Sequence, residues 1–190
     1  MIGKFIKGNT AVFIDSSNIY FSQKTIGWRI DFKRLLEYFK QETKLSRIAF
    51  YGAINPENEK EKKFHDFLEI IGYVVRHKKI KFIKDENEGD FGGHHKGNID
   101  VDLTIDAVHL RDSYDSFVLL SGDGDFESLI KYLKGFKKRC VVISTKGSVS
   151  IELLRQAKFI DFKKIRNQIE LKNKNSSAFS RRGKPGSVSP

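Results

Sequence analysis

The sequence contains few of the features that mark secreted or membrane proteins. Its 190 residues include a single cysteine, so no intrachain disulfide can form. Cys140 lies in an apolar run, and we expect it to be a reduced, buried core side chain. No run of about 18 apolar residues is present, so we expect no membrane span and no membrane partner. The first ten residues also lack the apolar stretch of a signal peptide, which predicts a cytoplasmic protein.

Acidic residues are outnumbered: 24 aspartates and glutamates face 35 lysines and arginines, a formal net charge of +11. A field of that sign favours polyanions, and nucleic acid first among them. A solvated lysine-rich surface would give the same number, so charge alone does not decide between binding and solubility.

Apolar β-type runs alternate with helical patterns along the chain. This alternation predicts an α/β fold, with three layers and a mainly parallel central sheet. We expect a domain over residues 1–171 and a basic disordered tail over 172–190, where no apolar pattern remains. The expected strands cover 10–14, 47–53, 73–83, 117–120, 139–144 and 159–162. The expected helices begin at 19 and cover 32–44, 57–71, 99–110, 126–136, 148–156 and 163–171, with a loop over 84–98.

Two of these helices have recognisable starts. Asp31 is a suitable N-cap for the helix over 32–44, and Asn55-Pro56 supplies a cap and a first-turn proline for the helix at 57. His65 lies on the second of these helices among lysines, so we expect it to be solvated.

The turn Ser121–Phe126 is the most informative segment. It places Asp123 and Asp125 directly after an apolar strand, at the edge of a parallel sheet where ligands bind. Asp15 likewise ends the first strand and is followed by Asn18. Neighbouring carboxylates repel each other unless a cation or proton lies between them, and Mg²⁺ prefers such oxygen ligands.

A third acidic segment begins the helix at 99. Asp102 and Asp106 are four residues apart and share a face, whereas Asp100 and Asp102 diverge, so only one or two of the three can point at a common site. Each acid also has a structural explanation, because acids are favoured in first helical turns and Asp125 is a suitable N-cap.

The segments FIDSSN, KGNIDVDLTIDAV and LLSGDGDF, spread over residues 10–162, resemble the NYN family, the LabA-like branch of the PIN-like nucleases. The resemblance implies a PIN-like Rossmannoid sheet and ribonuclease chemistry that depends on Mg²⁺ or Mn²⁺. It places the family's metal-binding and catalytic acids on Asp15, Asp100, Asp123 and Asp125. Asn18 matches a further catalytic position, and the additional candidates are Asp102, Asp106 and Ser121.

The expected substrate contacts are basic. They are Arg76, Lys78, Lys79, Lys81 and Lys96, of which the last also matches a lysine of the family. The alternative is that lysines on an edge strand simply prevent aggregation. Tyr20 and Trp28 follow the first acid and are candidates for stacking on a base, with core packing as the alternative.

Two functions of different class remain. The first is a metal-dependent ribonuclease that hydrolyses phosphodiester bonds, with RNA as substrate and single-stranded DNA as an alternative. The second is a non-catalytic regulatory module that binds nucleic acid or protein. The acid cluster favours the nuclease, because a polyanion binder gains nothing from buried negative charge. Homo-oligomerisation is left open.

Overall fold

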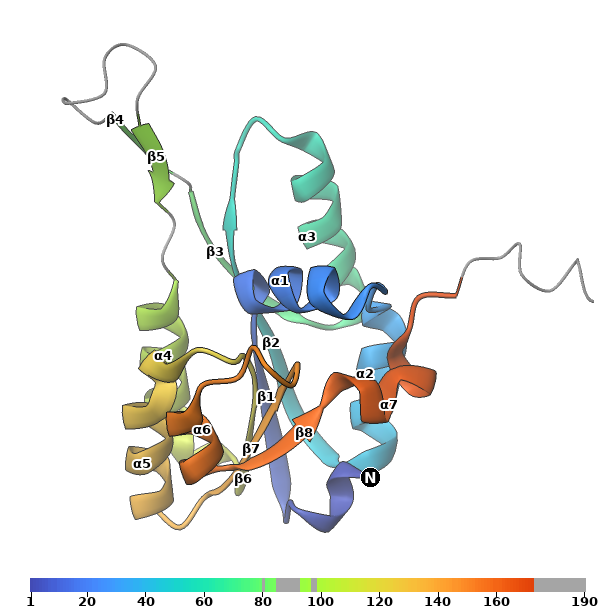
Figure 1. Cartoon of the computed structure of the whole chain (residues 1–190), viewed down its shortest axis with the longest axis vertical. Coiled ribbons are helices and arrows are strands. Elements are labelled where there is room, and N and C mark those ends of the chain that lie inside the picture. The colour runs from blue at the N-terminus through green and yellow to red at the C-terminus, as the bar shows by residue number, and fades with distance from the viewer. Residues whose placement is uncertain (80, 85–92, 97–98, 173–190) are drawn as a thin grey trace, which may run out of the picture.

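The structure is a computed structural model that describes residues 1–79, 81–84, 93–96 and 99–172. Its centre is a six-stranded sheet of order β3-β2-β1-β6-β7-β8, in which every neighbouring pair is parallel (Figure 1). The strands are β1 (Asn9–Asp15), β2 (Lys44–Ile54), β3 (Val74–Lys79), β6 (Ser116–Leu120), β7 (Arg139–Ser144) and β8 (Lys158–Asp161).

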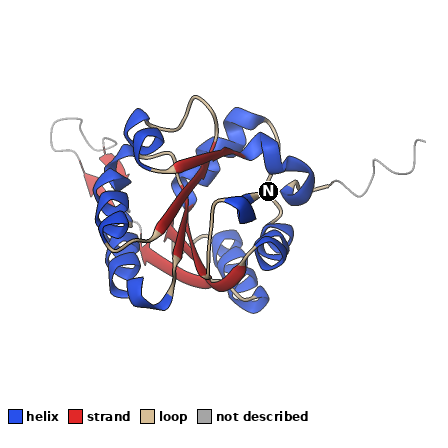
Figure 2. Ribbon diagram, turned by 90° about the horizontal axis from the view of Figure 1, so that it is seen from below, coloured by secondary structure: helices blue, strands red, loops and turns tan. Residues whose placement is uncertain are grey.

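Helices cover both faces of this sheet (Figure 2). One face carries α1 (Ser16–Ile26), α2 (Phe32–Glu42), α3 (Glu59–Ile71) and α7 (Phe162–Ile169). The other carries α4 (Asp100–His109), α5 (Glu127–Gly135) and α6 (Ile151–Gln156). The predicted three-layer α/β fold is therefore confirmed.

The central strands are apolar on both sides because each side faces a helical layer. Along β1, Val12 and Ile14 pack under α1, α2 and α7, whereas Ala11 and Phe13 pack under α4 and α5. Within the described ranges, no helix is long and apolar enough to cross a membrane.

A short hairpin replaces part of the expected loop over 84–98. Strands β4 (Lys81–Lys84) and β5 (Gly93–Lys96) pair antiparallel, apart from the main sheet. The loop prediction was wrong at Gly93–Lys96 because this glycine- and histidine-bearing segment has no apolar alternation, while strand pairing depends on the backbone.

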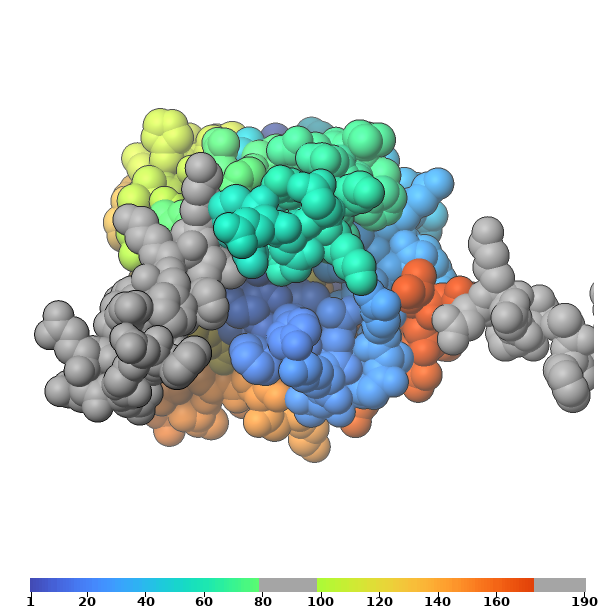
Figure 3. Space-filling model, turned by 90° about the horizontal axis from the view of Figure 1, so that it is seen from above, coloured from blue at the N-terminus to red at the C-terminus, as the bar shows by residue number. Residues whose placement is uncertain are grey.

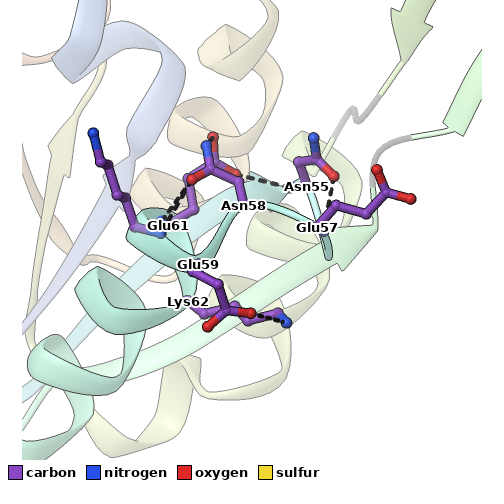
Figure 4. Close-up of polar contacts among 7 residues, drawn as sticks. Asn55, Glu57, Asn58, Glu59, Glu61 and Lys62 are labelled. Atoms are coloured by element: carbon purple, nitrogen blue, oxygen red, sulfur yellow. Dashed lines mark hydrogen bonds and ion pairs between the residues drawn. The ribbon is translucent and has the colours of Figure 1, made fainter.

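The start of α3 also differs from the expectation. Asn58, not Asn55, is the N-cap: its Oδ1 accepts hydrogen bonds from the backbone N–H groups of Lys60 and Glu61 (Figure 4). The Glu61 carboxylate steadies this cap by accepting from Asn58 Nδ2 at 2.9 Å and from the Asn55 backbone N–H at 2.8 Å. The Asn55 side chain instead stabilises a turn before the helix, because its Oδ1 accepts a hydrogen bond from the Glu57 N–H. The helix therefore begins after the Asn58 cap and not at the proline.

Two side chains have a burial that the sequence did not predict. His65 is 7 % exposed and packs beside Phe50 and Phe64, with ring centroids 5.8 and 6.0 Å away, so the expectation of a solvated histidine was wrong. Burial, followed by the nearby His77, lowers the pKa of His65. Cys140 is a free thiol but only half-buried, and burial raises its pKa to about 12.

Candidate functional site

The acidic segments meet at the point in the sheet where the strand order reverses, between β1 and β6. The chain adds β2 and β3 on one side of β1 and then crosses to add β6, β7 and β8 on the other. Such a switch point opens a crevice at the carboxyl ends of the strands, where α/β proteins bind ligands. Figure 3 views this edge, with α1 lying across it between α3 and the residues that follow β7. The carboxyl ends of β1 and β6 carry Asp15 and the Ser121–Asp125 turn.

Asp15 is the most constrained of the acids. It is the last residue of β1 and the N-cap of α1, and it is 1 % exposed. Its Oδ1 accepts from the Ser17 N–H at 3.0 Å, the Ser17 hydroxyl at 2.9 Å and the Asn18 N–H at 3.3 Å. Its Oδ2 accepts from Asn18 Nδ2 at 2.8 Å and the Ser121 hydroxyl at 2.9 Å. Five hydrogen bonds thus hold this buried carboxylate in place.

The same network links α1 to the turn after β6. Asn18 Oδ1 accepts from the Gly122 N–H at 2.8 Å, and the Ser121 hydroxyl accepts from the Asp123 N–H at 3.1 Å. Asp123 Oδ1 in turn accepts from the Asp125 N–H at 3.0 Å, which begins the 3₁₀ turn Gly124–Phe126. Hydrogen bonds from the two turns therefore orient the Asp15 and Asp123 carboxylates.

Gly122 ties this turn to the loop after β7. Its carbonyl accepts from the Ser150 N–H at 2.9 Å. A Cβ at this position would lie 2.3 Å from the Ser148 carbonyl oxygen and 2.8 Å from the Ser144 hydroxyl oxygen, so only glycine permits the close approach.

Asp100 completes the acidic cluster from α4. It lies in the first turn of the helix and is half-buried. Burial and then the charges of Asp15, Asp123 and Asp125 raise its pKa to about 6. Because the charges of the other three acids contribute to this rise in pKa, Asp100 interacts electrostatically with all of them.

Asp102 and Asp106 face elsewhere. Asp102 pairs with Lys78 of β3. Asp106 accepts from the Tyr51 hydroxyl at 2.9 Å and from Arg76 Nε at 3.3 Å. This divergence follows from the helical spacing, and it leaves Asp100 as the α4 acid beside Asp15.

The other sequence candidates are distributed around the site. Arg76 and Lys78 both have acidic partners on α4 and are not directed solely at solvent. The side chains of Lys79, Lys81 and Lys96 lie outside the described part of the structure. Among the aromatic candidates, Trp28 packs in the core and is 7 % exposed, whereas Tyr20 is 55 % exposed on α1.

Three residues of this site were missed by the sequence prediction. Ser17 supplies two of the five hydrogen bonds to Asp15, and its position two residues after the acid is typical of an Asx turn. Tyr51 fixes Asp106, and burial and then this hydrogen bond raise the pKa of Tyr51. The close approach at Gly122 was also missed. Only the Ser17 contact has a local sequence signal.

The side chains fit a hard divalent ion of the Mg²⁺ or Mn²⁺ type in one respect: Asp100, Asp123 and Asp125 are carboxylates, and such ions prefer oxygen ligands. Among the described residues, however, no group of three or more histidine, cysteine or acidic side chains has an arrangement ready to hold a metal. Mg²⁺ commonly uses only one or two protein carboxylates and keeps waters, so the two observations are compatible.

Comparison with known proteins points to one family. The NYN domain model matches residues 9–171. The chain is 34 % identical over 170 residues to the low amplitude and bright protein LabA of Synechococcus elongatus, covering 87 % of this chain and 90 % of that protein. It also resembles the crystal structure of a protein of unknown function from Vibrio parahaemolyticus, with a TM-score of 0.70 and 26 % identity, over 87 % of this chain and 97 % of the other.

Proposed function

Because the chain belongs to the NYN domain family, and therefore carries a PIN-like nuclease-type module, we propose that it is a metal-dependent ribonuclease. The proposed reaction is hydrolysis of phosphodiester bonds in RNA at the acidic cluster, with Mg²⁺ or Mn²⁺ as cofactor. The cellular location that we expect is the cytoplasm.

One observation carries this proposal. Asp15, Asp100, Asp123 and Asp125 come together at the switch point of the sheet, where burial and then the charges of the other three acids raise the pKa of Asp100 to about 6. Concentrated, partly buried negative charge costs free energy in a protein whose net charge is +11. A binding module for polyanions gains nothing from this arrangement, whereas a site for a divalent cation requires it.

The chain's own residues have distinct roles in this proposal. Asp100 and Asp123, with Asp125 at the rim, would hold the ion directly or through water. Asp15 has both oxygens occupied by hydrogen bonds, so its role is to add charge and to fix Asn18 and Ser121. When bound, such an ion polarises a phosphoryl oxygen and lowers the pKa of water, which makes water a better nucleophile.

A specific observation favours the second candidate, a non-catalytic module that binds nucleic acid or protein. The Asp15 carboxylate is satisfied by protein donors alone, and no described trio of acids is arranged for a metal. A non-catalytic protein of this fold would show the same hydrogen-bond network around Asp15 without binding a metal ion.

Cleavage of labelled RNA with Mg²⁺, Mn²⁺ or EDTA separates the two candidates. The Asp123→Asn variant keeps an oxygen to accept from the Asp125 N–H but loses the charge, so we expect cleavage to fall at least about 100-fold while RNA affinity is retained. Asp112→Asn is the matched control, since Asp112 is 79 % exposed and away from the cluster. Retained cleavage in Asp123→Asn contradicts the nuclease proposal, and metal-independent RNA binding without any cleavage supports the module.

A further inference from the structure

A basic cavity lies at the opposite edge of the sheet from the acids. It has a volume of about 400 Å³ and is formed where β7 and β8 begin and where the chain enters β1. These strands begin at the lower edge of the cartoon in Figure 1. None of the described residues that line it is acidic. Its lining includes six cationic side chains: Lys4, Lys7, Lys134, Lys138, Arg139 and Lys158.

The charges of these six side chains are not neutralised by the rest of the described chain. None of them forms an ion pair with a described acid. Lys134 donates to Gln156 at 3.2 Å, Lys138 donates to the Tyr114 carbonyl at 2.8 Å, and the other contacts are uncharged as well. Like charges that line a concave surface focus the field and attract anions.

Asp115 is an acid beside this region, and its carboxylate is bound to the backbone and to none of the six cations. It starts the turn into β6, and its carboxylate accepts from the Asn9 N–H at 2.9 Å. The Asp115 carbonyl also accepts from the Arg139 N–H at 3.0 Å. The carboxylate therefore anchors the entrance to β1 and does not pair with the cavity's cations.

A second, apolar cavity of about 500 Å³ adjoins the first. The two share Lys4, Phe5 and Lys158 as a common wall. Phe159 and Ile160 contribute to the apolar lining of the second cavity. Lys158 Nζ lies 4.7 Å from the centre of the Phe5 ring, so a cation and an aromatic ring stand together at the junction.

We propose that this pair of cavities binds a nucleoside di- or triphosphate, with the phosphates among the cations and the base in the apolar cavity. The volumes are those of small-molecule sites, and lysine and arginine are the usual partners of phosphate oxygens. The acidic cluster lies at the far end of the strands, so these cations are not part of that site. The seven residues of β1 separate the two edges by about 20 Å. The site is thus independent of the proposed nuclease activity.

Calorimetric titration of the full-length protein with ATP, in EDTA and at low ionic strength, tests the proposal. We expect ATP to bind, and a Lys4→Gln/Lys7→Gln/Arg139→Gln variant to lose at least about tenfold in affinity. These three side chains are exposed and make no hydrogen bond or ion pair with a described residue, so the fold should be retained, as a thermal melt will verify.

The matched control removes the same charge elsewhere. A Lys33→Gln/Lys60→Gln/Lys63→Gln variant changes three exposed lysines far from the cavity and should bind ATP as the wild type does. Equal losses in the two variants would show attraction by net charge alone and overturn the proposal. So would the absence of ATP binding to the wild type.

Two further ligands test the chemistry of the occupant. Inorganic tripolyphosphate should bind more weakly than ATP, because it leaves the apolar cavity empty, and equal affinity would overturn the role of the base. The second ligand is a single-stranded RNA. If the cavity variant binds this RNA more weakly than the wild type does, and the wild type does not bind ATP, the nucleotide proposal is overturned and the cations are assigned to contacts with an RNA backbone.

Discussion

The raised pKa of Asp100 predicts that the acidic cluster destabilises the metal-free fold. Burial and three neighbouring carboxylates raise this pKa from 3.8 to about 6, so the folded state binds the proton more tightly than the unfolded state. Stability from this group is therefore present below pH 3.8 and is lost as the pH rises through about 6. Asparagine carries no charge at any of these pH values, so the Asp100→Asn variant does not lose this stability as the pH rises. We therefore expect the variant to be more stable than the wild type at neutral pH.

The size of the effect follows from the shift. Roughly two pKa units correspond to about 3 kcal/mol of unfolding free energy, at about 1.4 kcal/mol per unit. Because Asp100 is only half-buried, water screens part of this, and 3 kcal/mol is an upper bound. For a domain of this size each kcal/mol moves Tm by about 2–4 °C, so the variant should melt several degrees higher.

The assay is thermal unfolding in EDTA from pH 3.5 to 8 for the wild type, Asp100→Asn and the exposed control Asp112→Asn. The stability difference between wild type and Asp100→Asn should vanish at the acidic end and grow through pH 6, whereas Asp112→Asn should follow the wild type. Manganese should raise the Tm of the wild type more than that of Asp100→Asn. A pH-independent difference, or a variant that is less stable at neutral pH, would refute the reasoning.

Other predictions concern packing and binding. Gly122→Ala forces a contact with backbone and should lower the unfolding free energy by about 1–3 kcal/mol, while Gly135→Ala, whose Cβ would meet nothing within 4 Å, should not destabilise the fold in a denaturant titration. Replacing the exposed, edge-to-face pair Tyr20 and Phe21 by alanine should weaken single-stranded RNA binding without changing its salt slope; unchanged affinity would remove α1 from the interface. Deleting 172–190 should leave Tm unchanged and flatten the salt dependence of RNA binding, and a lower Tm would show that this segment packs on the domain.

The sequence predicted the layers and the edge of the sheet that carries the acids. Both follow from local patterns: the apolar run that ends at Asp15, the run before Ser121, and the alternation of strands with helices. Parallel strands then bring their carboxyl ends to one edge without further information. The α/β layering was predictable because it depends on order along the chain and on little else.

The orientation of helices against the sheet was not predictable in the same way. The sequence left Asp100, Asp102 and Asp106 as alternatives, because the rotation of α4 depends on how Leu103 and Ala107 pack beneath it. The same limit explains His65, since α3 buries His65 and Leu68. A stripe of apolar residues predicts a buried face only to within about one residue position on the helix.

The distribution of charge is the strongest physical argument for chemistry at the carboxyl edge. The chain has a formal net charge of +11, yet Asp15, Asp100, Asp123 and Asp125 lie near one another at this edge. A phosphodiester drawn to this protein would meet repulsion from Asp100 and its neighbours unless a cation stood between them. Asn18 and Ser121 hold the Asp15 carboxylate in place, and the cost in stability of the charge beside it is what the Asp100→Asn melts will measure. Proteins keep such unfavourable arrangements mainly where function requires them, which is why the stability of a metal-free variant bears on the proposed activity.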